Sequence, residues 1–190
     1  TTTGTTGVAN AIAIGTDAYT YGANGVAIGM NAGKGSTATS GNNVTVGADS
    51  GQRNQGTNNV AIGPGSGNDL GETVRQNIAL GSGAGNQIKS SSGFADYNIN
   101  GGKGYGHIIS IGSGSGRESD GNVNVAMGQL AGQGVIGNAN TGIGMWTGWN
   151  AKGDRNSAFG AASGGYVTGN NNSSLGRGAG NNVIGDNNTG

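Results

Sequence analysis

Residues 59–67 read Asn-Val-Ala-Ile-Gly-Pro-Gly-Ser-Gly, and residues 77–85 read Asn-Ile-Ala-Leu-Gly-Ser-Gly-Ala-Gly. The pattern recurs along the chain: an apolar residue precedes a marker glycine, and a small residue follows that glycine by three positions. The marker glycines are Gly15, Gly29, Gly47, Gly63, Gly81, Gly112, Gly128, Gly144, Gly160 and Gly176. The last five stand 16 residues apart. A period this short predicts a solenoid in which each repeat forms one coil.

The three residues before each marker glycine alternate in size, as in Val60, Ala61 and Ile62. Successive side chains of a strand point to opposite faces, so the large and the small residues form separate columns. We expect the large residues to pack inside the coil and the small ones to let another backbone approach from outside. A helix is excluded because each of the 45 glycines would cost about 1 kcal/mol relative to alanine.

The rest of each coil can be followed in the later repeats. An apolar or small residue recurs seven positions after the marker, at Val135, Ala151, Val167 and Val183, and a glycine follows it by two. We therefore expect two short strands per coil, joined by glycine and asparagine turns. One column, four before the marker, contains Asn43, Asn59, Asn77, Asn124, Asn140, Asn156 and Asn172. This column predicts turn caps or a stacked side-chain ladder rather than a ligand site.

The composition predicts a thin core. Only 32% of the residues are hydrophobic and 5% are aromatic, so the coils need stacking and lateral association, and we expect a homo-oligomer. Nine basic and nine acidic residues give no basic footprint for nucleic acid. The sequence has no cysteine and no apolar run of about 20 residues, and no signal peptide is recognised in it. We expect residues 1–190 to be one domain cut from a longer protein, because repeat-like sequence reaches both ends.

One interval breaks the period, since Gly81 and Gly112 are 31 residues apart. Residues 89–106 within it are either a degenerate coil or an inserted loop, and solenoid insertions often form the binding face. Their aromatic residues, Phe94, Tyr97 and Tyr105, are therefore candidate ligand contacts.

Trp146 and Trp149 are the other candidate ligand contacts. They share one turn, and Trp146 stands where other repeats have glycine. Large amphipathic aromatic residues dominate binding hot spots. Packing at a subunit interface or against the inserted segment is the alternative, because aromatic side chains are also the best source of buried area in this chain.

The sequence favours neither catalysis nor a cofactor or metal site. His107 is the single histidine, and a lone imidazole makes no Ser-His-Asp arrangement. The aspartates do not form the repeated Gly-Gly-x-Gly-x-Asp units of a calcium β-roll. The glycine-rich runs lack the Lys-Ser/Thr and the helix of a phosphate-binding loop. We expect a non-enzymatic protein.

The units at 59–67 and 77–85 resemble the N-S-V-A-I-G-x-x-S/A repeat of YadA-like heads in trimeric autotransporter adhesins. The resemblance extends from about Asn10 to Gly190. It implies an all-β, left-handed parallel β-roll of about ten coils of about 16 residues, assembled as a homotrimer. Heads of this family keep to about 14 residues per coil, so the longer coils here imply larger turns.

The resemblance also implies a function in cell adhesion and virulence. Such heads stand on the surface of Gram-negative bacteria, anchored in the outer membrane by a C-terminal barrel that this sequence lacks. They attach to host cells and to matrix proteins such as collagen, fibronectin or laminin, and some drive autoaggregation.

Three other functions are alternatives to adhesion. A structural segment of a trimeric phage or bacterial fibre fits the same repeats. A hexapeptide-repeat acyltransferase needs six-residue rungs and a catalytic histidine, and the 16-residue period does not match it. Ice binding needs regular Thr-x-Thr ranks, whereas the threonine-rich sequence here is confined to the first six residues.

Overall fold

The computed structural model describes residues 4–5, 10–20, 22–37, 41–70, 74–87, 105–106 and 108–190. Over these ranges the chain is all-β and contains no helix. The strands are β1 (Gly4–Thr5), β2 (Ile12–Ile14), β3 (Tyr19–Thr20), β4 (Val26–Ile28), β5 (Val44–Val46), β6 (Val60–Ile62), β7 (Val74–Arg75), β8 (Ile78–Leu80), β9 (Tyr105–Gly106), β10 (Ile109–Ile111), β11 (Val125–Met127), β12 (Thr141–Ile143), β13 (Ser157–Phe159) and β14 (Ser173–Leu175).

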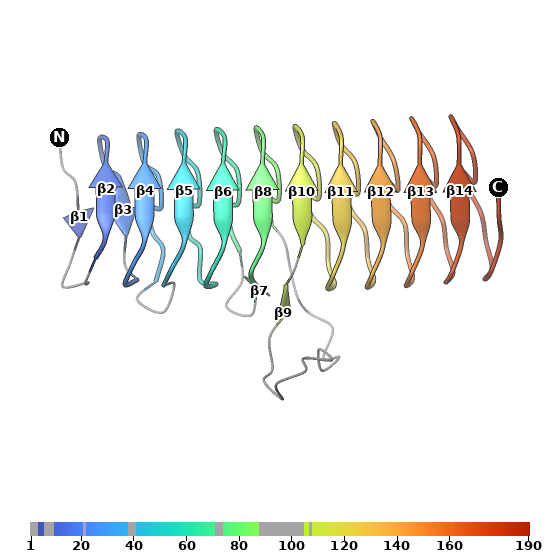
Figure 1. The fold of residues 1–190 in the computed structure, drawn as a ribbon, viewed down its shortest axis with the longest axis horizontal. Coiled ribbons are helices and arrows are strands. Elements are labelled where there is room, and N and C mark those ends of the chain that lie inside the picture. Colours follow the sequence, from blue (N-terminus) through green and yellow to red (C-terminus); the bar gives the residue numbers. More distant parts are fainter. Residues whose placement is uncertain are drawn as a thin grey trace.

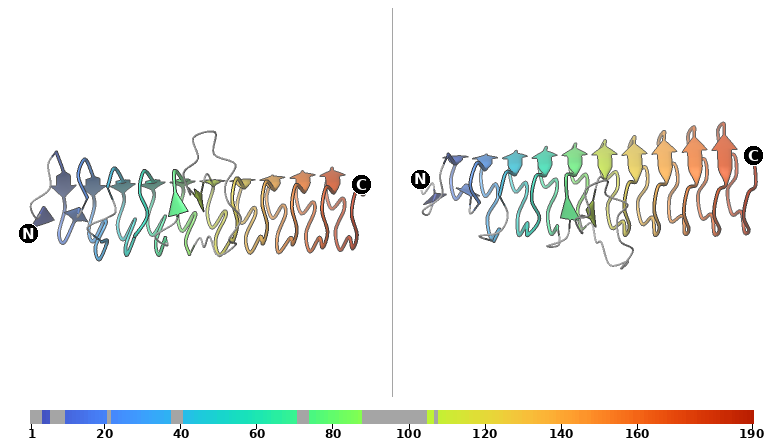
Figure 2. Two further views of the ribbon diagram at one scale, coloured as in Figure 1. Left: turned by 90° about the horizontal axis from the view of Figure 1, so that it is seen from below. Right: turned by 60° about the horizontal axis from the view of Figure 1, so that its bottom comes forward.

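Ten of these strands form one parallel sheet in the order β2-β4-β5-β6-β8-β10-β11-β12-β13-β14. They are the three-residue segments before the marker glycines, and they pair at equivalent repeat positions, as Ala61 does with Ala79. The molecule is therefore a parallel β-solenoid with its termini at opposite ends of the stack (Figure 1). From β10 to β14 the connecting segments all lie on one side of the sheet (Figure 2). The predicted strands and their parallel register are confirmed.

The marker glycines allow the coils to stack closely. Gly29 has φ of 131°, a conformation that side chains rarely adopt, and a Cβ there would lie 2.5 Å from the carbonyl oxygen of Gly47. Equivalent clashes with the next coil recur at Gly63, Gly112 and Gly160. Each coil thus leaves its strand through a turn that only glycine fits.

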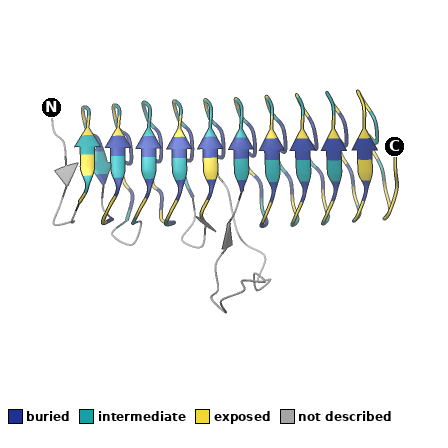
Figure 3. Ribbon diagram, viewed as in Figure 1, coloured by how far each residue is buried: buried dark blue, intermediate teal, exposed yellow. Residues whose placement is uncertain are grey.

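The prediction of which column faces inward is wrong. Ala27 and Ala61 are at most 1% exposed, whereas Ile14 is 56% and Ile62 43% exposed. The cause is the narrow coil: the returning segment passes so close that a Cβ on Gly67 would lie 2.6 Å from the Cβ of Ala61. Only small side chains fit between the sheet and this segment. Figure 3 shows the result, with buried strand centres from β4 to β14.

The large residues consequently lie on the outside of the sheet. We call this surface the apolar sheet face, and its most exposed apolar residues one before the marker are Ile14, Ile28, Ile62, Met127, Ile143, Phe159 and Leu175. Ile12 and Ile78, three before the marker, are exposed on the same face.

Buried asparagines hold the coils together. The backbone N–H of Asn156 donates to Oδ1 of Asn140 at 2.9 Å, and Nδ2 of Asn140 donates to the carbonyl oxygen of Gly153 at 2.9 Å. The same ladder runs from Asn43 through Asn59 and Asn77, and again from Asn124 to Asn188. This confirms the predicted ladder, which satisfies buried backbone groups that would otherwise be unpaired.

Ile108 interrupts the ladder between its two parts. Its N–H donates to Oδ1 of Asn77 at 2.9 Å, but its own side chain is apolar and packs against Leu70. A second small core contains Val135, Ala151 and Val167, with Val183 partly buried beside it. The core is thin, as the composition predicted.

The second strand of each coil is present only as single-residue bridges in the later repeats. They link Asp120 to Ile136, Ile136 to Lys152, Lys152 to Thr168 and Thr168 to Ile184, all in parallel. The predicted position is thus correct, but the pairing is shorter than a strand.

The interval between Gly81 and Gly112 is crossed in one step of the sheet, because β8 pairs directly with β10. β7 and β9 form a separate parallel pair in which Val74 lies opposite Tyr105. Apart from Tyr105–Gly106, the segment 89–106 lies outside the described residues, and so does His107.

Candidate ligand-contact surface

Among the residues with left-handed backbone in the described connections, two recur two and six positions after the marker glycine. We call these positions turn columns. Asp49 and Trp146 share the first column with φ of 57° and 60°, and Asp69 and Tyr166 share the second with φ of 58° and 55°. The repeated turns therefore stack side chains of different chemistry at equivalent places on the surface.

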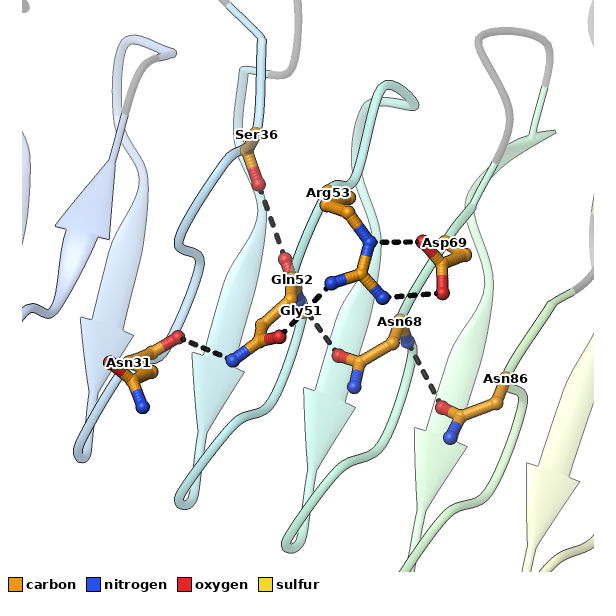
Figure 4. Close-up of polar contacts among 8 residues, drawn as sticks. All are labelled: Asn31, Ser36, Gly51, Gln52, Arg53, Asn68, Asp69 and Asn86. Carbon is orange, nitrogen blue, oxygen red and sulfur yellow. Dashed lines mark hydrogen bonds and ion pairs between the residues drawn. The ribbon is translucent and has the colours of Figure 1, made fainter.

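In the N-terminal half these columns hold a polar network (Figure 4). Arg53 donates from Nε to Oδ1 of Asp69 at 2.5 Å and from Nη2 to Oδ2 at 2.7 Å, so the pair is bidentate across two coils. These hydrogen bonds, aided by the guanidinium charge, lower the pKa of Asp69 against the opposing effect of burial. Gln52 lies beside them and accepts from Nη1 of Arg53 at 3.3 Å.

Further bonds continue the network along the stack. The N–H of Gln52 donates to Oδ1 of Asn68 at 2.8 Å, and the N–H of Asn68 donates to Oδ1 of Asn86 at 3.0 Å. Nδ2 of Asn31 donates to Oδ1 of Asp49 at 2.9 Å. The polar side chains of this network thus bond to one another and to neighbouring backbone.

In the C-terminal half, two aromatic residues occupy the corresponding surface. Trp146 and Trp149 lie in the connection between β12 and β13, with ring centroids 6.1 Å apart and planes tilted by 59°. The structure therefore brings together these two predicted ligand contacts. Trp146 is 48% exposed, although its ring packs against its neighbour.

A third aromatic residue, Tyr166, completes the cluster from the next connection. Its ring lies edge-on to Trp149, with centroids 5.1 Å apart and planes at 62°. Tyr166 is 49% exposed, and its N–H donates to the carbonyl oxygen of Trp149 at 2.8 Å. We call Trp146, Trp149 and Tyr166 the aromatic ridge.

Tyr166 was not among the site residues predicted from the sequence, although a signal was present. Tyr166 stands in the second turn column, where neighbouring repeats have Asn150 and Asn182. A bulky residue in a left-handed position is uncommon and merits a functional question.

A shallow hollow adjoins the ridge at Tyr166. Its lining is Gly134, Ile136, Asn150, Lys152, Tyr166 and Thr168. No acidic residue lines it, and within the described chain its polar side chains make no hydrogen bond or ion pair with one another or with other residues. This surface therefore presents half-exposed aromatic rings beside amide, hydroxyl and ammonium groups that can bond to a ligand.

The structure does not place the remaining sequence candidates on this surface. Phe94 and Tyr97 lie outside the described residues. Tyr105 lies in β9, which pairs with β7 apart from the main sheet.

No protein-family model, curated protein or solved structure matches this chain. The described ranges contain no group of three or more His, Cys, Asp or Glu side chains arranged to hold a metal ion. The same ranges have no helix with the length and hydrophobicity to cross a membrane. The structure by itself thus defines the class of protein: a parallel β-solenoid with an apolar sheet face and, away from it, an aromatic ridge.

Proposed function

We propose that the chain is the head of a non-enzymatic bacterial surface adhesin, which assembles as a homotrimer and attaches its cell to host tissue. In this proposal the solenoid is left-handed, with one coil for each strand of the ten-stranded sheet. The full protein sits on the outer membrane of a Gram-negative bacterium. Its partners are matrix or cell-surface proteins of the collagen, fibronectin or laminin class, and a second outcome is autoaggregation.

The apolar sheet face is the observation that carries this proposal. Ile14, Ile143 and Phe159 are 38–56% exposed on the outside of one continuous sheet. Soluble monomers rarely expose large contiguous apolar patches, and such patches mark interaction sites. Burial of this face against two further copies would supply the hydrophobic area that each thin coil lacks.

The resemblance of the repeats to YadA-like heads supports the choice of three copies and the adhesive role. A repetitive surface also suits weak individual contacts. Linked sites raise the overall avidity by roughly 10² to 10⁴ over a single contact, first within the trimer and then across the cell surface.

The decisive experiment is the oligomeric state of the purified chain, measured by analytical ultracentrifugation, together with binding to immobilised collagen, fibronectin and laminin. We expect a trimer that coats at least one of these proteins. A monomer at micromolar concentration contradicts the proposed assembly, and a trimer that coats none of them contradicts the proposed partners.

A paired substitution locates the interface. Ile62→Lys with Ile143→Lys places two charges on the apolar sheet face without touching the buried column, so we expect dissociation to monomers with the β-sheet spectrum retained. The matched control is Ala162→Lys, because Ala162 is an exposed residue of a connection rather than of the sheet. Trimers that survive the double substitution would place the interface elsewhere.

A structural segment of a trimeric phage or bacterial fibre is the alternative. The N-terminal half favours it, since the polar side chains there bond across coils, as a spacer requires. The two functions separate in the plate assay: a fibre spacer forms the same trimer but coats no host protein.

A further inference from the structure

We propose that the aromatic ridge and the adjoining hollow form a binding site for neutral, β-linked oligosaccharides. The inference names a ligand class for one surface of the proposed adhesin head, and to that extent it rests on the proposed function. Its evidence is independent of the apolar sheet face.

The three rings of the ridge have a geometry that suits stacking of sugar units. Trp149 lies in the middle, and the rings of Trp146 and Tyr166 flank it with tilts of 59° and 62° and about half of their surface exposed. An aromatic face is electron-rich and attracts the weakly positive C–H bonds that a β-linked pyranose presents on its flat faces. Two flanking rings let successive sugar units of one chain stack.

The polar groups beside the rings can bond to the hydroxyl groups of a sugar. Asn150 and Thr168 offer donors and acceptors, Lys152 offers a donor, and no residue of the described chain bonds to these side chains. Sugar hydroxyl groups both donate and accept, so a mixed amide and hydroxyl lining suits them. Small-ligand sites combine apolar and aromatic walls with a few such polar groups.

The charge of the surface selects against a polyanion. Lys152 is the one basic residue of the hollow lining, whereas sulfated chains and nucleic acids are bound by clustered basic residues. A neutral saccharide needs no such cluster.

The position of the ridge leaves it free in the proposed trimer. Trp149 belongs to the connection between β12 and β13, and Tyr166 to the connection between β13 and β14. These connections lie on the opposite side of the strands from the viewer of Figure 1, while the apolar residues of the sheet project from its outer side. One head can therefore bind its own copies and a glycan at separate surfaces.

The turn columns supply variants that remove the rings with little harm to the fold. Trp146→Gly introduces the residue that other coils have at Gly65, Gly83 and Gly178, and glycine relieves the left-handed backbone. Tyr166→Asn introduces the residue found at Asn150 and Asn182. Ala162→Gly is the matched control, since it makes the same backbone change in the first column without removing a ring.

The chain contains only two tryptophans and both lie in the ridge, so tryptophan fluorescence reports directly on the site. We propose titration of the whole chain with cellotetraose and the tetramer of N-acetylglucosamine, with calorimetry on the same samples. We expect a saturable fluorescence change with at least one of them. Trp146→Gly and Tyr166→Asn should each weaken binding by about tenfold or more, as for aromatic hot spots, and Ala162→Gly should leave it unchanged.

Four outcomes overturn the inference. The first is that neither saccharide binds, and the second is that binding survives both ring substitutions. The third is that heparin or a proline-rich peptide binds the ridge instead. The fourth is that Trp146→Gly with Tyr166→Asn dissociates the oligomer, which makes the ridge a subunit contact.

Ultracentrifugation and matrix-protein coating on the same preparation keep the two proposals distinguishable. A trimer that coats a matrix protein but binds no saccharide refutes this inference alone. A monomer that binds saccharide through the ridge refutes the proposed assembly alone.

Discussion

The N-terminal and C-terminal halves of the stack have the same repeated backbone conformation and differ in the side chains of their turn columns. In the turn columns of the N-terminal half, Arg53 and Asp69 bond across coils, whereas in the C-terminal half Trp146 and Tyr166 flank Trp149. Both halves have the same left-handed turns. The difference shows that the marker glycines and the buried ladder set the fold, which leaves the turn columns free to vary in chemistry.

The largest loss of stability is expected from substitution of the marker glycines, which both halves share. Gly29→Ala and Gly160→Ala place a Cβ 2.5 and 2.6 Å from a carbonyl oxygen of the next coil, at φ of 131° and 121°. We expect each to lower the free energy of unfolding by about 3 kcal/mol or more, from clash and backbone strain together. Urea denaturation followed by circular dichroism measures this loss.

The control for these substitutions is Gly65→Ala. No heavy atom lies within 4 Å of a Cβ at Gly65, and its φ of 63° is one that other residues of the column adopt. We expect a loss of about 1 kcal/mol there. Equal effects at Gly29, Gly65 and Gly160 would refute the claim that coil contact, rather than glycine itself, is what the marker provides.

The next effect concerns the buried ladder, whose two parts run through different halves. Asn140→Ala removes the acceptor for the N–H of Asn156 and the donor to Gly153, both in a buried column. Unpaired buried groups cost about 1–3 kcal/mol each, so we expect a loss of about 2–3 kcal/mol in urea denaturation.

Asn171→Ala is the matched control for the ladder. Asn171 is exposed in the neighbouring column, where the chain already has Ala139. We expect a loss below about 1 kcal/mol there. If the two asparagines proved equally costly to replace, burial of the ladder would not be the source of its stabilisation.

A smaller effect tests the ridge as the counterpart of the polar network. Trp149→Gln introduces the residue that the preceding coil has at Gln133, and it removes ring contacts to Trp146 and Tyr166. We expect a loss of about 1–2 kcal/mol by thermal or urea unfolding, since aromatic pairs contribute about 0.5–1.5 kcal/mol beyond their buried area.

Trp146→Gly should cost less than Trp149→Gln, because relief of the left-handed backbone offsets the lost contact of a half-exposed ring. The reverse order of stability would mean that Trp146, rather than Trp149, is the packing centre of the ridge.

Much of the fold was predictable from the sequence because the same residue types recur at fixed positions of each repeat. The spacing of the marker glycines gave the strands and their parallel register, and the asparagine column gave the ladder. The inward face was not predictable from residue size alone. Large apolar side chains usually favour burial. Here Gly67 of the returning segment lies so close to Ala61 that no larger side chain fits inside the coil, so close packing decides which column is buried.

The candidate site was predictable only in part. Trp146 and Trp149 are three residues apart in one turn, so their contact follows from local sequence. Tyr166 reaches Trp149 from the next coil, and that contact depends on the offset between two turn columns, which no local pattern reveals. The polar side chains of the hollow come from successive coils, so their proximity likewise follows only from the stacking of residues 134–168.

The smallest effect concerns the Arg53 and Asp69 pair of the N-terminal half. Both side chains of the pair are partly exposed, so we expect Arg53→Ala to cost less than about 1 kcal/mol at neutral pH and low salt. Hydrogen bonds from Arg53 lower the pKa of Asp69 in the folded state. The stabilisation is therefore complete above the ordinary carboxyl pKa of about 3.9 and disappears as the pH falls through the lower folded value.

Denaturation curves of the parent chain and Arg53→Ala, recorded from neutral to acid pH and at two salt concentrations, test this dependence. The two curves should converge in acid and in high salt, where protonation or screening removes the attraction. Tyr166→Asn, in the same turn column of the other half, exchanges two neutral residues and should leave the difference from the parent constant across this range. A pH-dependent difference for Tyr166→Asn, or a constant one for Arg53→Ala, would contradict the distinction between a charged pair and a neutral ring at equivalent turn positions.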